Sequence, residues 1–94
     1  MITHVVMWKF KPDTEKEMHA FLDGLQALKG VIPQIRDLQV HVSCNPANEF
    51  DAMLWTQFDS MEDLQAYQTD PRHIAAGQIG KASRETRASL DFEE

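Results

Sequence analysis

The sequence predicts an α+β fold in which four strands and two helical regions follow one another in the order β-α-β-β-α-β. Stretches in which apolar residues alternate with other residues are typical of strands. They are separated by stretches in which apolar residues recur every three or four positions, as on one side of a helix. Prolines, glycines and asparagines stand between these stretches and favour turns. In the split βαβ arrangement the first and third strands are central, and helices cover one face of an antiparallel sheet.

The first half of the chain begins with a predicted strand over Ile2–Lys11, which is rich in β-branched and aromatic residues. We expect a helix to begin at Thr14, because Thr14 and Glu17 have the spacing of a capping box. Gly30 can adopt the left-handed conformation that ends a helix. The apolar stripe of this helix consists of Met18, Phe21, Leu22, Leu25 and Leu28.

Two further strands are predicted over Ile35–Ser43 and Phe50–Phe58. The residues Asn45–Asn48 between them have the composition of a turn. One side of the first of these strands consists of Leu38, Val40 and Val42.

The second helical region is predicted to begin at Ser60 and to restart at Asp70, because aspartate suits the N-cap and Pro71 suits the first helical position. The piece from Pro71 to about Ser83 is a weak helix, since it contains two glycines. The last strand is predicted over Thr86–Phe92, and its alternating apolar residues are Ala88, Leu90 and Phe92.

The two central strands are apolar on both faces, because successive side chains of a strand point to opposite sides. One face of the first strand consists of Ile2, His4, Val6, Trp8 and Phe10, and the helices can cover it. The other face of the two strands carries Val5, Met7, Met53 and Trp55. A monomer rarely exposes such a patch, so we expect a second copy to cover it and form a two-fold homodimer. A loop or the C-terminal tail is the alternative cover.

Composition limits the class of protein. The 94 residues fit a single domain over residues 1–94, and the net charge of −6 argues against a nucleic-acid surface. No apolar run approaches the roughly 20 residues of a membrane helix, and residues 1–6 do not resemble a signal peptide. The lone Cys44 cannot form an intramolecular disulfide, so we expect a cytoplasmic protein. No histidine pair has helical metal-site spacing, and we expect no metal or cofactor.

Four segments carry a resemblance to a known family: Ile2–Lys11 with His4 inside it, Ile32–Arg36, Phe58–Tyr67 and Asp70–His73. Through them the whole chain resembles the stress-responsive α/β-barrel domain family, often written Dabb. The resemblance implies a ferredoxin-like subunit and a dimeric α+β barrel in which two subunits pack sheet against sheet. It implies no particular activity, because members of this family differ in function.

The resemblance extends distantly to a plant polyketide cyclase of this family, which makes olivetolic acid and uses a tyrosine and a histidine from a Tyr-x-x-x-Pro-x-His region. Tyr67 and His73 stand at those positions, and His4 matches a further pocket histidine. Ala52 stands where that enzyme has a histidine on its third strand, so that specific cyclisation is not supported.

A candidate site follows from strand parity, since His4 points to the helix-covered face and Tyr67 and His73 come from the helical region that covers it. His73 would be the third residue of its helix, where the helix N-terminus disfavours the imidazolium form. A neutral histidine can act as a general base and a tyrosine can orient a carbonyl, as in proton abstraction by a cyclase or isomerase. The expected wall of this ligand pocket is Trp8, Phe21, Leu54 and Phe58.

Each site residue has a structural alternative: a hydrogen-bonded core histidine, a buried tyrosine ring with a wet hydroxyl, and an ordinary helix start. Three functions therefore remain. The leading one is a pocket for an aromatic or polyketide-like molecule. The second is a non-catalytic structural stress protein, and the third is a haem-binding or cofactor-independent oxygenase-like barrel.

Overall fold

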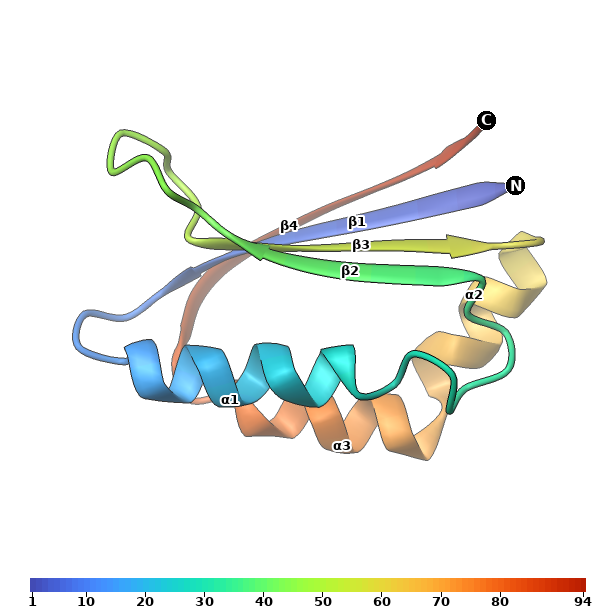
Figure 1. Ribbon diagram of the computed structural model, residues 1–94, viewed down its shortest axis with the longest axis horizontal. Helices are drawn as coiled ribbons and strands as arrows, with labels where there is room; N and C mark the ends of the chain where they lie inside the picture. Colours follow the sequence, from blue (N-terminus) through green and yellow to red (C-terminus); the bar gives the residue numbers. More distant parts are fainter.

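In the computed structural model, which covers residues 1–94, one four-stranded antiparallel sheet carries its helices on one face (Figure 1). The strand order β2-β3-β1-β4 places β1 and β3 in the centre, so the predicted ferredoxin-like α+β fold is confirmed. The elements in chain order are β1 (Ile2–Phe10), α1 (Glu15–Gln26), β2 (Asp37–Val42), β3 (Ala52–Phe58), α2 (Met61–Thr69), α3 (Pro71–Ile79) and β4 (Arg84–Glu93).

The start of α1 corrects one expectation, since the capping box at Thr14 does not form. The Thr14 hydroxyl instead donates a hydrogen bond of 2.6 Å to the Lys11 carbonyl, within a turn where Asp13 has a φ of 64°. The hydroxyl is thereby directed to the preceding turn, and it accepts from none of the free amides of the first helical turn. At the other end the helix stops at Gln26, and Gly30 takes its left-handed φ of 80° in the turns that follow.

Other boundaries differ from the prediction by a few residues. β2 and β3 begin at Asp37 and Ala52, later than expected, and α3 ends at Ile79 instead of near Ser83. The chain turns there because the Ser83 amide donates to the Gly80 carbonyl at 3.1 Å. The residues thus released from α3 allow β4 to start at Arg84, two positions before the predicted Thr86.

The pairing of β4 with β1 decides which way the side chains of β4 point. Opposite residues of an antiparallel pair share a face, so Leu90 lies on the same face as Val5, its partner in register. The open face of β4 therefore consists of Ala88, Leu90 and Phe92. The helix-covered side receives the polar residues Arg87, Ser89 and Asp91.

The open face of the sheet carries a continuous apolar surface on β1, β3 and β4. In register, Val5 faces Trp55 and Met7 faces Met53 across β1 and β3, as parity predicted. β4 extends this surface with Leu90, which is 65% exposed, so neither a loop nor the C-terminal tail covers that part. The connection between β2 and β3 rises on this side, opposite to α1 and α3 (Figure 1).

The helix-covered face contains the hydrophobic core. The row that β1 directs to the helices is buried along its whole length, and α1 packs Phe21, Leu22 and Leu25 against the sheet. None of the helices has the length and apolar character needed to cross a bilayer.

The contact between α1 and α3 depends on a glycine. A methyl group on Gly80 would lie 2.6–2.9 Å from three carbons of Phe21, which is only 1% exposed. Gly24 on α1 serves as a control for Gly80, because a methyl group there would also make a close contact, at 2.9 Å from the end of the Ile79 side chain. Ile79 is 49% exposed and can move aside, whereas Phe21 cannot.

We expect Gly80→Ala to lower the free energy of unfolding by about 1–3 kcal/mol, because displaced Phe21 disturbs a packed core. Gly24→Ala is expected to leave this free energy unchanged or raise it by up to about 1 kcal/mol, since alanine favours helix. Urea denaturation followed by circular dichroism measures both variants. Equal stability of the two would contradict this account of the α1–α3 contact.

Candidate functional site

A cavity of about 260 Å³ lies between the helix-covered side of the sheet and the helices. Its floor is apolar and formed by the central strands, while β4 and α3 contribute polar side chains. The lining residues are His4, Val6 and Trp8 from β1, Leu54 from β3, Phe21 and Leu25 from α1, Gln68 from α2, His73 and Gly77 from α3, and Arg84 and Arg87 from β4.

Two groups of aromatic rings are associated with this cavity. Trp8 and Phe21, both of which line it, meet edge to face with ring centroids 4.9 Å apart. In the second group Tyr67 lies between Phe58 and His73, at centroid distances of 5.1 Å and 4.2 Å. His73 thus lines the cavity with the buried, tilted rings of Tyr67 and Phe58 behind it.

His4 is held by a carboxylate from the last strand. It is buried near the start of β1, and its Nδ1 forms a hydrogen bond with Asp91 of β4. An ionised carboxylate only accepts hydrogen bonds, so the Nδ1–H of His4 donates and Nε2 is the nitrogen left for other partners. This contact, between residues 87 positions apart in sequence, fixes the orientation of the imidazole ring.

Tyr67 and His73 carry polar atoms that find no partner within the protein. The Tyr67 hydroxyl and the Nδ1 atom of His73 are both buried and make no hydrogen bond, and the same holds for the indole Nε1 of Trp8. Burial raises the pKa of the Tyr67 hydroxyl well above its ordinary range, so it remains a donor. Burial also lowers the pKa of His73, and the nearby His4 and Arg87 act in the same direction.

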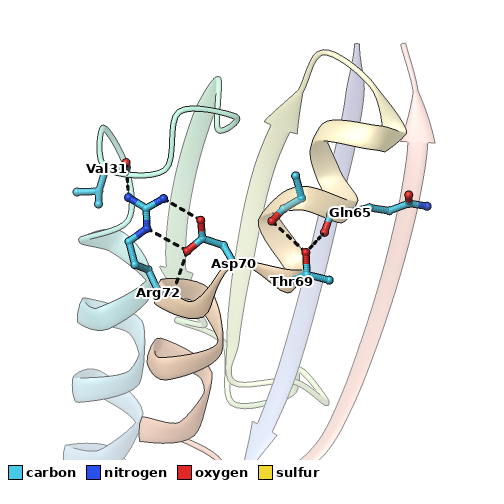
Figure 2. A network of polar contacts seen from close by, with 6 residues as sticks. Val31, Gln65, Thr69, Asp70 and Arg72 are labelled. Carbon is cyan, nitrogen blue, oxygen red and sulfur yellow. Dashed lines mark hydrogen bonds and ion pairs between the residues drawn. The ribbon is translucent and has the colours of Figure 1, made fainter.

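The start of α3 places His73. The Asp70 carboxylate accepts from the backbone N–H of Arg72 at 2.8 Å and from its guanidinium, as Figure 2 shows. The same guanidinium donates to the Val31 carbonyl at 3.1 Å and so ties α3 to the segment after α1. Asp70 therefore acts as the N-cap that the sequence predicted, with Pro71 behind it, and His73 follows one residue after Arg72. The pKa of Asp70 is lowered to about 2 by its hydrogen bonds to Arg72.

The predicted site residues occupy different places. His4, His73, Trp8, Phe21 and Leu54 line the cavity. Tyr67 and Phe58 do not line it; both are fully buried, with Tyr67 directly behind His73.

Sequence reasoning missed the residues that β4 contributes. Arg84, Arg87 and Asp91 reach this side because the apolar residues of β4 face the other way. The alternation of Ala88, Leu90 and Phe92 was a usable signal, since an edge strand with one apolar face must direct its polar residues to the opposite face.

The other surface hollows do not bring buried, unpartnered polar groups together. One of about 570 Å³ beside the β1–α1 turn is lined mainly by exposed polar and charged residues, among them Lys9, Lys11 and Glu85. No group of three or more His, Cys, Asp or Glu side chains is placed to hold a metal ion.

Fold and site together define a class of protein: a ferredoxin-like α+β subunit with a small, partly polar cavity beneath its sheet. Residues 2–94 match the family model of the Stress responsive A/B Barrel Domain, Dabb. The chain therefore belongs to the Dabb family, and the resemblance found in the sequence is confirmed.

Solved structures agree with this assignment. A dimeric protein of unknown function with a ferredoxin-like fold from Bacteroides fragilis NCTC 9343 is 32% identical, with a TM-score of 0.93, and the match covers 99% of this chain and 95% of that chain. A dimeric ferredoxin-like protein of unknown function from Thermobifida fusca YX is 21% identical, with a TM-score of 0.88 over 99% of this chain and 90% of that chain.

A hydroxynitrile lyase from Passiflora edulis is 15% identical, with a TM-score of 0.83 over 97% of this chain and 90% of that chain. The sequence identities to the Passiflora edulis and Thermobifida fusca proteins are low, so these two similarities establish the fold alone. A comparison with curated proteins gives no match.

The lowered pKa of His73 predicts a pH dependence of stability. The unfolded chain takes up the proton first, so the free energy of unfolding should fall as the pH drops below about 6.5 and level off below the folded pKa. His73→Gln removes this component, which is measured by urea denaturation at a series of pH values. His19→Gln, on the exposed side of α1, controls for loss of an imidazole. An unchanged pH slope in His73→Gln would rule out a buried, neutral His73.

Proposed function

We propose that this Dabb-family protein binds a small planar molecule, aromatic or polyketide-like, in the cavity between its sheet and its helices. The observation that carries the proposal is the set of unpartnered polar atoms in and beside the cavity: Trp8 Nε1, Tyr67 Oη and His73 Nδ1. Buried polar groups in folded proteins nearly always have a partner. A ligand with a carbonyl or hydroxyl group would supply one.

The size of the cavity narrows the ligand. Drug-sized ligands occupy sites of about 300–1,000 Å³, and this cavity holds about 260 Å³. A single-ring compound suits that volume better than a long polyketide chain or a porphyrin does. This favours the small-molecule function over the haem-binding alternative.

The same residues support proton transfer as the chemistry of the site. A neutral His73 with a free Nδ1 has the properties of a general base, and Tyr67, which does not line the cavity, packs against its ring from behind. His4, oriented by Asp91, is a second candidate. The Passiflora edulis neighbour is a hydroxynitrile lyase, so this fold accommodates an enzyme. We propose cofactor-independent proton abstraction next to a carbonyl as the reaction.

The competing proposal is that the protein has a purely structural role in the stress response and binds no ligand. Such a protein gains nothing from leaving polar atoms unpartnered in its interior, since each costs about 1–3 kcal/mol of stability. The group at Trp8, Tyr67 and His73 therefore favours the ligand-binding function.

We also infer that two copies pair through the open sheet face. The apolar surface of Val5, Met7, Met53 and Trp55 continues onto Leu90 and Phe92 of β4, and Leu90 is 65% exposed. The Bacteroides fragilis relative is itself dimeric. The exposed, unpaired Cys44 fits the reducing cytoplasm, which we propose as the place of the protein.

The dimer is tested by a charge on the most exposed residue of this surface. Leu90→Glu should weaken dimerisation by at least about tenfold, because an unpaired carboxylate would be buried between the copies. Met61→Glu, which adds the same charge to an exposed position of α2, should leave the dimer intact. Sedimentation equilibrium measures both. A wild-type protein that is monomeric at high concentration would refute the interface.

Ligand binding is tested with acetophenone, a neutral single-ring ketone. The chain has two tryptophans, so a ¹H–¹⁵N spectrum shows two indole N–H signals, which a Trp55→Phe variant assigns. Saturable movement of the Trp8 signal alone is expected, because Trp8 lines the cavity and Trp55 lies on the open face.

Gly77 offers a matched pair of variants for this test. A side chain there meets open space, since no atom lies within 4 Å of an added methyl group, and Gly77 lines the cavity. Gly77→Leu should fill the cavity and abolish binding, whereas Gly77→Ala should retain it. Equal binding to both variants would place the ligand elsewhere.

Catalysis is tested by measuring hydrogen–deuterium exchange of acetophenone in D₂O. Proton abstraction by the protein would replace the methyl hydrogens of acetophenone with deuterium from the solvent. His73→Ala should slow this exchange by at least about 100-fold, as loss of a general base does. An unchanged rate would remove His73 from the reaction and leave the binding proposal in place.

A further inference from the structure

The wall of the cavity is positively charged, although the protein as a whole has a net charge of −6. Arg84 and Arg87 line the cavity, and no aspartate or glutamate does. The other two arginines, Arg36 and Arg72, form ion pairs with Asp59 and Asp70. Arg84 and Arg87 form none. The only arginines without a carboxylate partner are therefore those at the cavity.

Arg84 is held in place by an aromatic ring. Its guanidinium carbon lies 5.6 Å from the centroid of the Phe21 ring, within range of a cation–π interaction, and both residues line the cavity. Burial and the charge of Arg87 lower the pKa of Arg84. Two neighbouring cations without an anion repel each other, so this arrangement gains stability when an anion binds between them.

Arg87 lies close to the polar atoms of the site. It stands opposite Trp8 in the register of β4 with β1, and its charge influences both Tyr67 and His73. The nearest acidic residue on the same side of β4, Asp91, is already hydrogen-bonded to His4. No carboxylate of the chain forms an ion pair with Arg84 or Arg87.

We propose that the ligand of this cavity is an anion, a single-ring aromatic carboxylate bound through Arg84 and Arg87. This rests on the proposed function, because it assigns a charge to the ligand of the same cavity. The planar, forked guanidinium matches a carboxylate with two parallel hydrogen bonds. The ring would then lie over the apolar floor formed by Val6, Trp8 and Leu54, with the unpartnered Nδ1 of His73 at its edge.

The test compares benzoate with benzamide, which have nearly the same shape and differ in charge. Binding to the full chain is followed by the Trp8 indole signal. Benzoate should bind at least about tenfold more tightly than benzamide, and Arg84→Gln or Arg87→Gln should each weaken benzoate binding by about tenfold. Each variant should weaken benzamide binding less than it weakens benzoate binding. Arg36→Gln, which removes the same charge outside the cavity, should change neither affinity.

The outcomes separate the two proposals. Equal affinity for benzoate and benzamide would overturn the anion assignment and leave the cavity as a binding site for neutral molecules. Binding of neither compound would overturn the anion assignment, and the proposed function would fall with it only if acetophenone also failed to bind. Arg84 is partly buried, so if Arg84→Gln fails to fold, Arg87→Gln carries the test, because Arg87 is exposed. Arg87→Lys keeps the charge and should recover part of the benzoate affinity.

Discussion

The register of β4 against β1 is the constraint on which both surfaces of the sheet depend. Leu90 pairs with Val5 and Asp91 with His4, so the apolar residues of β4 face away from the helices and its polar residues face toward them. A shift by one residue would reverse every side chain of the strand. Leu90 and Phe92 would then enter the interior, and the arginines of the cavity would lie on the open face. The apolar open face and the polar cavity are thus two consequences of one pairing.

The helices explain why the cavity remains beside β4 instead of closing. α1 packs its stripe of large apolar residues against the sheet, and the Gly80–Phe21 contact brings α3 close to α1. α3 itself presents small residues to the interior, with Ala76 buried and Gly77 at the cavity wall. The space that large side chains would fill is bordered by His73 and by two arginines. Because these side chains are polar, the space is better filled by a polar ligand than by the close packing of apolar side chains.

The sequence was sufficient for the order of the elements, because apolar periodicity and turn residues are local signals. It also placed the faces of β1 and β3, since parity needs only the strand itself. It failed at Thr14, whose hydroxyl serves the preceding turn instead of the helix. It also missed Arg84, Arg87 and Asp91. The alternation of Ala88, Leu90 and Phe92 separates the two faces of β4, but which face meets the helices depends on a pairing between the two ends of the chain.

The central claim is that the space between sheet and helices is a binding site for a small anionic ring. A crystal structure of the protein grown with benzoate tests this most directly. The account predicts a benzoate in the cavity, with its carboxylate within hydrogen-bond distance of Arg84 and Arg87 and its ring against Trp8 and Leu54. A cavity closed by its own side chains, with Tyr67 and His73 hydrogen-bonded to each other and benzoate absent, would contradict it.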